Sequence, residues 1–98
     1  MAKKLAPIHP GEILADVFMS PNRLSANRLS LDLHIPANRV TEIIRGRRAI
    51  TADTALRLAR YFDTSAELWL GLQQDYDLQK TTDEMGARIE RDVRVAAA

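Results

Sequence analysis

Hydrophobic residues recur at helical spacing in five successive segments of the chain. Pro10 fits the first position of the first predicted helix, where no backbone donor is needed. This helix ends at Ser20-Pro21-Asn22, because the residue before a proline is displaced from helical geometry. Its apolar face comprises Ile13, Leu14, Val17 and Phe18.

Only a very short break separates the second predicted helix from the third. Ser25 is a favourable N-cap for the second helix, and Leu24 and Leu29 are placed as a hydrophobic staple across it. Helical spacing resumes directly after Pro36. Two short helices joined by such a turn form a helix-turn-helix. The positions expected to pack its helices together are Leu29, Ser30, Leu33, Ile35, Val40 and Ile43.

Two residues next to the third helix are expected to adopt a left-handed backbone. The turn of a helix-turn-helix favours glycine, because φ is positive there. This chain has His34 at that position, which tolerates the region better than a β-branched residue does. Gly46 is expected to end the third helix as a left-handed cap, with Arg45 near the negative end of the helix dipole.

The last two predicted helices begin at Thr51 and Ser65, both favourable N-caps. Their apolar faces comprise Ala55, Leu58, Ala59 and Phe62 in the fourth, and Leu68, Trp69, Leu72 and Tyr76 in the fifth. From Gln79 the apolar pattern weakens, and Gly86 favours either a marginal helix or a mobile tail. The chain thus divides into a flexible segment (1–8), a helix-turn-helix domain (9–78) and a C-terminal tail or marginal helix (79–98).

The composition narrows the class of protein. A chain of 98 residues, 46% hydrophobic and rich in Leu, Ala and Ile, predicts one small all-α domain. It has no cysteine, which excludes disulfides, thiolate metal sites and a cysteine nucleophile. No signal peptide and no membrane span are predicted, because polar residues interrupt every apolar run. We therefore expect a cytoplasmic protein that does not contact membranes.

Charge is distributed unevenly, although the net charge is only +1. The segment from Arg23 to Arg48 contains six arginines and two acidic residues, an excess of four positive charges. The segment from Tyr61 to Glu90 contains seven acidic residues, one lysine and one arginine, an excess of five negative charges. A basic region made only of arginine suits bidentate contacts to phosphate or guanine, and the alternative is a solvated surface.

Catalytic chemistry finds little support in the sequence. His9 and His34 fall in different segments, and neither has a nucleophile or metal ligand at helical spacing. Asp75 and Asp77 point to different sides of a helix, which prevents a paired-carboxylate site. The chain also lacks a glycine-rich phosphate loop. We therefore expect no enzyme, no catalytic residue, no metal site and no cofactor.

Three motifs resemble one family. His9-Pro10-Gly11-Glu12-Ile13-Leu14 resembles the opening motif of the HigA-type antitoxins, a branch of the phage-repressor-like helix-turn-helix class. The segments 50–58 and 67–78 resemble its fourth and fifth helices, so the likeness spans about residues 8–78. His34 and Gly71 depart from the pattern, where the family more often has Gly and Asn.

The resemblance implies a five-helix phage-repressor-like domain and two activities. The first is neutralisation of a small basic RelE-like (HigB-type) toxin that cleaves mRNA. The second is repression of its own operon by a homodimer on a palindromic operator. Two other hypotheses stay open: a stand-alone repressor without a toxin, and an interaction module that has lost DNA binding.

The fold class assigns roles to the arginine-rich region. The third helix enters the major groove, so its first residues are candidates for reading bases: Ala37, Asn38, Arg39, Thr41 and Glu42. A second set is better placed for phosphates: Ser25, Asn27, Arg28, Arg45, Arg47 and Arg48. The alternative for each is an ordinary surface residue.

The fifth helix is the candidate for dimerisation. Paired recognition helices need a two-fold interface, for which the candidates are Trp69, Leu70, Leu72 and Tyr76. The alternative is that Trp69 and Tyr76 complete the core. The acidic later part is either a surface for the basic toxin or a solubilising face. If the toxin binds the folded core, the chain should resist degradation.

Overall fold

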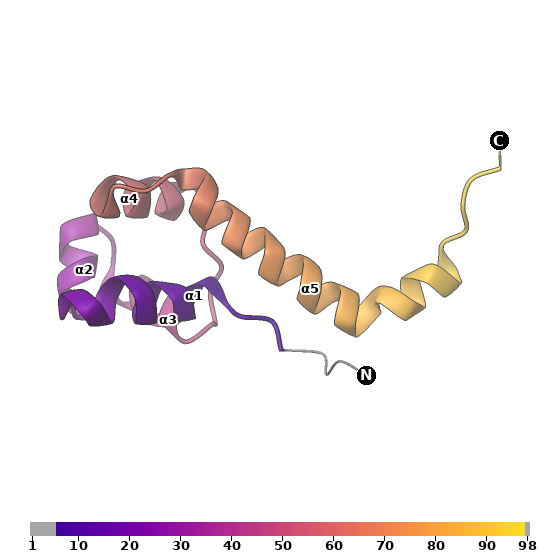
Figure 1. The fold of residues 1–98 in the computed structure, drawn as a ribbon, viewed down its shortest axis with the longest axis horizontal. Coiled ribbons are helices and arrows are strands. Elements are labelled where there is room, and N and C mark those ends of the chain that lie inside the picture. Colours follow the sequence, from indigo (N-terminus) through magenta and orange to yellow (C-terminus); the bar gives the residue numbers. More distant parts are fainter. Residues whose placement is uncertain (1–5, 98) are drawn as a thin grey trace.

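The computed structural model describes residues 6–97, which form helices joined by short turns, with no strand among them (Figure 1). The elements in order are α1 (Pro10–Ile13), η1 (Leu14–Met19), η2 (Ser20–Asn22), α2 (Ala26–Leu33), α3 (Ala37–Ile44), α4 (Ala52–Phe62) and α5 (Ala66–Asp92). The predicted all-α helix-turn-helix fold is confirmed.

The first predicted helix is one rod that changes its winding twice. After α1 it widens to the π-helix η1, where the Ser20 N–H donates to the carbonyl of Ala15, and then tightens to the 3₁₀ turn η2. Arg23 ends it with a left-handed backbone at φ 53°. The predicted end at residues 20–22 is correct, whereas the change of winding was not predicted.

The predicted caps are confirmed. The hydroxyls of Ser25, Thr51 and Ser65 accept hydrogen bonds from backbone N–H groups three residues on, at 3.0, 3.4 and 3.1 Å. His34 and Gly46 have left-handed backbones, with φ of 58° and 73°. The helix-turn-helix therefore forms as its sequence predicts, including a histidine in the turn.

Trp69 lies at the centre of the core. Its side chain is 0% exposed, and its ring lies 4.9 Å from that of Phe18. Its indole N–H donates to the Thr64 hydroxyl at 2.8 Å, so its polar atom is also satisfied inside the protomer. Trp69 is therefore a core residue of the protomer, which is the second of the two alternatives, and not a residue of the dimer interface.

Gly11 brings α1 and α3 into backbone contact. A Cβ atom built on Gly11 would lie 1.8 Å from the carbonyl oxygen of Ile43, which no side chain can accommodate. His9 fixes the same end of α1, because its Nδ1 accepts from the Gly11 N–H at 2.9 Å. The His9 ring also packs edge-to-face on Tyr76 of α5, with centroids 4.8 Å apart. This corner joins α1, α3 and α5.

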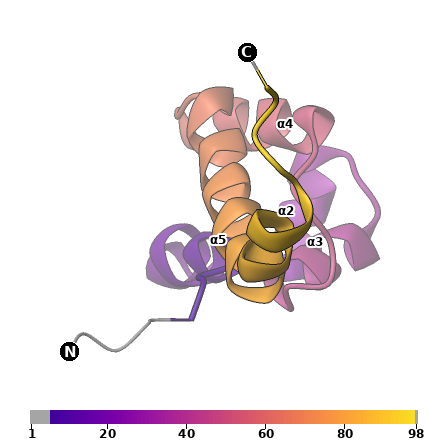
Figure 2. The same ribbon diagram turned by 90° about the vertical axis from the view of Figure 1, so that its right-hand side faces the viewer.

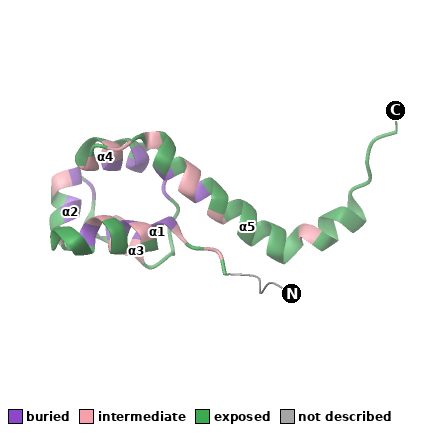
Figure 3. Cartoon of the chain, viewed as in Figure 1, coloured by how far each residue is buried: buried purple, intermediate pink, exposed green. Residues whose placement is uncertain are grey.

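The fifth helix is far longer than its apolar pattern predicts. It spans 27 residues and passes residue 78 without a break, so the segment left open as a tail or marginal helix is helical as far as Asp92. Figure 1 shows this part projecting from the body, and Figure 3 colours almost all of its residues as exposed. The Arg88–Asp92 ion pair of 3.5 Å lies one turn apart along it. No helix within residues 6–97 is long and apolar enough to cross a membrane.

We expect Gly11→Ala to destabilise the protein by about 2–3 kcal/mol, because the methyl group must push α1 away from α3. Gly71→Ala is the matched control, since no atom lies within 4 Å of a Cβ built at that helical position. It should stabilise α5 by up to about 1 kcal/mol. Urea unfolding of both variants measures the two free energies, and equal effects would contradict the tight contact.

His9 makes folding sensitive to mild acid. Burial lowers the pKa of its imidazole below the ordinary 6.5, against the opposing charges of Asp77 and Glu12. Below pH 6.5 the unfolded chain therefore binds more protons at this group, so stability falls until the lowered pKa is reached. His9→Asn keeps a capping oxygen without the titration. The Tm of wild type should fall between pH 7.5 and 5.5 more steeply than that of His9→Asn, and equal slopes would refute this role.

Candidate nucleic-acid interface

The outer face of α3 carries the five candidates for base reading. Ala37 and Asn38 are exposed at the start of the helix, directly after the extended Pro36, and no side chain caps the first amides. Arg39, Thr41 and Glu42 are half-buried. The Thr41 hydroxyl donates back to the Ala37 carbonyl at 3.2 Å. The exposed polar groups at the start of α3 are therefore the side chain of Asn38 and the free backbone amides.

Arg39 is held by α4. Its Nη1 atom lies 3.6 Å from Oδ1 of Asp53, and the same oxygen accepts from Nε of Arg57 at 2.8 Å. The hydrogen bond from Arg57, aided by the charge of Arg39, lowers the pKa of the Asp53 carboxyl below its ordinary value. Asp53 thus stays ionised and orients the guanidinium of the recognition helix.

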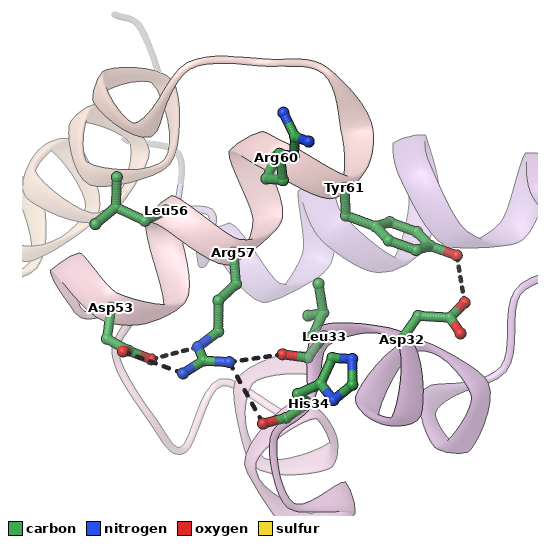
Figure 4. A pocket seen from close by; sticks show the side chains of 8 residues that line it. All are labelled: Asp32, Leu33, His34, Asp53, Leu56, Arg57, Arg60 and Tyr61. Atoms are coloured by element: carbon green, nitrogen blue, oxygen red, sulfur yellow. Dashed lines mark hydrogen bonds and ion pairs between the residues drawn. The ribbon is translucent and has the colours of Figure 1, made fainter.

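Arg57 also binds the turn of the helix-turn-helix. Its Nη1 donates to the carbonyl of Leu33 at 2.8 Å and to that of His34 at 3.4 Å (Figure 4). These carbonyls end α2 and have no partner within the helix. Asp53 and Arg57 were not among the candidates from the sequence, although their spacing of four residues on a predicted helix is a signal for such a pair.

A second ion pair joins α3 to the loop before α4. Nε and Nη2 of Arg48 both donate to Oε1 of Glu42, at 3.0 and 2.7 Å. The predicted base reader Glu42 and the predicted phosphate contact Arg48 therefore neutralise each other. A hollow of about 300 Å³ brings Arg39, Arg48 and Arg57 together around Asp53.

The other phosphate candidates differ in how far they are engaged. Arg28 pairs with Asp32 at 3.1 Å, and Ser25 caps α2 with its hydroxyl. Asn27 is exposed on the first turn of α2, where its carbonyl accepts from the Ser30 hydroxyl. Arg45 and Arg47 are exposed after α3 and form no ion pair within residues 6–97. These two are the arginines most available to an anion.

The candidates for dimerisation do not form one exposed surface. Leu72 packs against the core and Tyr76 is half-buried against His9, whereas Leu70 is 38% exposed. Other apolar side chains of α5 are exposed further along the helix: Leu78, Met85 and Ile89. In the described part of the chain, no three His, Asp or Glu side chains gather to hold a metal ion.

Comparisons with known proteins agree with this geometry. A helix-turn-helix family model matches residues 21–69. The chain is 50% identical to virulence-associated protein I of Dichelobacter nodosus, over 78% of this chain and 70% of that protein. An addiction module antidote protein of the HigA family from Coxiella burnetii has 50% identity and a TM-score of 0.88, covering 94% of this chain and all of that one. The Pseudomonas aeruginosa antitoxin HigA, solved with the higBA promoter, has 43% identity and a TM-score of 0.89, covering 93% and 99%.

Proposed function

The chain belongs to the HigA-type antitoxins, a family of DNA-binding helix-turn-helix proteins that are not enzymes, and from this membership we propose two linked activities. It represses its own operon by binding a palindromic operator as a homodimer. It also neutralises a co-encoded RelE-like (HigB-type) toxin that cleaves mRNA. The relative from Pseudomonas aeruginosa, solved with its promoter, supports the first activity.

The observation that carries the DNA-binding proposal is the side-chain arrangement on α3. Asn38 is exposed and matches the donor and acceptor of adenine, while Arg39 is oriented by Asp53 and matches guanine. The methyl group of Ala37 suits thymine. Thr41 and Glu42 lie further along the same helix, where Glu42 must first leave Arg48 to accept from cytosine. These residues are proposed to read the operator sequence.

The phosphate contacts are proposed on both sides of α3. Arg45 and Arg47 are exposed beyond its C-terminus, and Ser25, Asn27 and Arg28 lie at the start of α2, whose amides can meet a phosphate. Arg48 contributes positive charge next to the ion pair with Glu42. Such contacts fix the register on the duplex and make affinity depend strongly on salt.

Dimerisation is proposed along α5. A palindrome requires two recognition helices about 34 Å apart, so the second protomer must be held at a defined distance. Leu70 and the exposed apolar residues beyond residue 77 are available for this contact. Leu72 and Tyr76 are half-buried, Leu72 against the core and Tyr76 against His9, and we propose no direct dimer contact for them.

We expect Arg39→Ala to lower the preference for operator over random DNA by about 10-fold or more, the loss typical of one bidentate base contact. Asp53→Asn should lose part of the same preference, because Arg39 remains but is no longer oriented. Arg60→Ala is the control, since Arg60 is an exposed arginine of α4 that lies outside the ion pair between Arg39 and Asp53. Fluorescence anisotropy with both DNAs at several salt concentrations measures these effects. Salt-independent binding would contradict the DNA-binding proposal and favour an interaction module.

A pull-down of the tagged chain from its native cells tests the antitoxin half. We expect one stoichiometric basic protein of about 10 kDa, identified by mass spectrometry, together with operator DNA. The size follows from the small RNA-binding toxins that such a family neutralises. Operator DNA without a protein partner would instead establish a stand-alone repressor.

A further inference from the structure

An apolar surface with an acidic rim lies where α1 and η1 pack beside α5. We define the α1–α5 face by residues that line one hollow there and by exposed neighbours along the same two helices; its apolar members are Ile8, Ile13, Val17, Leu68 and Leu72, and its acidic members are Glu12, Asp16, Glu67 and Asp75. Ile8, Ile13, Leu72 and Asp75 line one hollow of about 310 Å³. Both elements therefore contribute to a single surface.

The remaining members extend the hollow along both helices. Phe18 contacts Trp69 and His9 contacts Tyr76, so the first rod runs antiparallel to α5. Val17 lies one turn beyond Ile13, and Leu68 lies one turn before Leu72, so both extend the face toward the same end. Val17 is 55% exposed and Leu68 40% exposed, although both are apolar. A contiguous apolar surface of this kind is typical of a docking site.

The charge of the face is of one sign. Its four carboxylates are exposed, and its nine members include no lysine or arginine. Lys80 borders the hollow at the ring of Tyr76, 5.8 Å from the ring centroid. Such a surface repels nucleic acid, and a second copy packed on it face to face would bring eight carboxylates together.

We propose that the α1–α5 face binds the basic toxin, an inference that rests on the antitoxin function proposed above. A protein that binds and cleaves mRNA must present Lys and Arg side chains to a polyanion. An apolar centre with an acidic rim suits such a partner, because the centre can bury apolar side chains and the rim carries the charge opposite to that of the toxin. The toxin's basic residues then pair with Glu12, Asp16 and Asp75 instead of RNA.

The position of the face leaves α3 free. In Figure 2, α1 and η1 lie to the left of α5, whereas α2 and α3 lie to its right. A toxin on the α1–α5 face and DNA on α3 therefore approach from different sides.

Two double variants test the proposal in the full-length chain. Val17→Lys/Leu68→Lys places positive charge in the apolar centre, and Asp16→Lys/Asp75→Lys replaces two of the four rim carboxylates with lysines at exposed positions, which cancels the negative charge of the rim. Leu56→Lys is the matched control, because Leu56 is 63% exposed on α4 outside the face. The probe is the small basic protein recovered in the pull-down, co-expressed with each antitoxin variant. Its affinity is measured by titration calorimetry, and operator binding of each variant reports folding.

We expect both double variants to lose about 10-fold or more in affinity for the toxin. The toxin affinity of Leu56→Lys, and the operator affinity of all three variants, should stay within about 2-fold of wild type. Wild-type affinity in both double variants would overturn the proposed face and leave the antitoxin function intact. Absence of any protein bound by wild type would overturn both. If Val17→Lys/Leu68→Lys loses operator binding as well, that variant has unfolded. The toxin affinity of Asp16→Lys/Asp75→Lys then decides whether the face binds the toxin. A dimer that dissociates in the rim variant with toxin affinity unchanged would assign the face to a second copy and overturn the proposal.

Discussion

The guanidinium of Arg57 links the turn of the helix-turn-helix to α4. The left-handed backbone of His34 ends α2 abruptly, which leaves the carbonyls of Leu33 and His34 without helical partners. Arg57 donates to both from α4, and Asp53, which accepts from Arg57, also forms an ion pair of 3.6 Å with Arg39 on α3. One arginine thus ties the end of α2, the first turn of α4 and the recognition helix into one unit. A charged group in this role is effective because charge-assisted hydrogen bonds are stronger than neutral ones.

The corner formed by His9 and Gly11 supports the opposite end of α3. Gly11 permits backbone contact with Ile43, and the ring of His9 also lies 3.6 Å from the position that a Cβ of Gly46 would take. The opening motif His9-Pro10-Gly11-Glu12 therefore has a physical basis: cap, helix start, close approach and a favourable charge at the helix dipole. With Arg57 at one end of α3 and this corner at the other, the recognition helix is held at both ends.

The sequence predicted what depends on local chemistry. Caps at Ser25, Thr51 and Ser65 and the left-handed Gly46 follow from side-chain and backbone preferences within a few residues, whereas the left-handed His34 follows from its place in the turn of the helix-turn-helix. Partners distant in the sequence were not predicted, such as Arg57 with Leu33 or Gln73, whose amide oxygen accepts from the Ile50 N–H at 2.8 Å. Helical spacing also could not distinguish a core position from an interface position for Trp69, because both require an apolar side chain on one face. The sequence left residues 79–98 open between a tail and a marginal helix, because the apolar pattern is weak from Gln79 and Gly86 interrupts it.

Both proposed surfaces consist of residues that are already folded. Arg39 is oriented before DNA arrives, and the hollow beside Ile13 and Leu72 exists without a partner. A partner that meets preformed helices does not have to order a flexible segment, so less of the contact energy is lost as conformational entropy. The antitoxin chain would then keep its fold whether or not toxin is bound, and proteases would find few open sites in it.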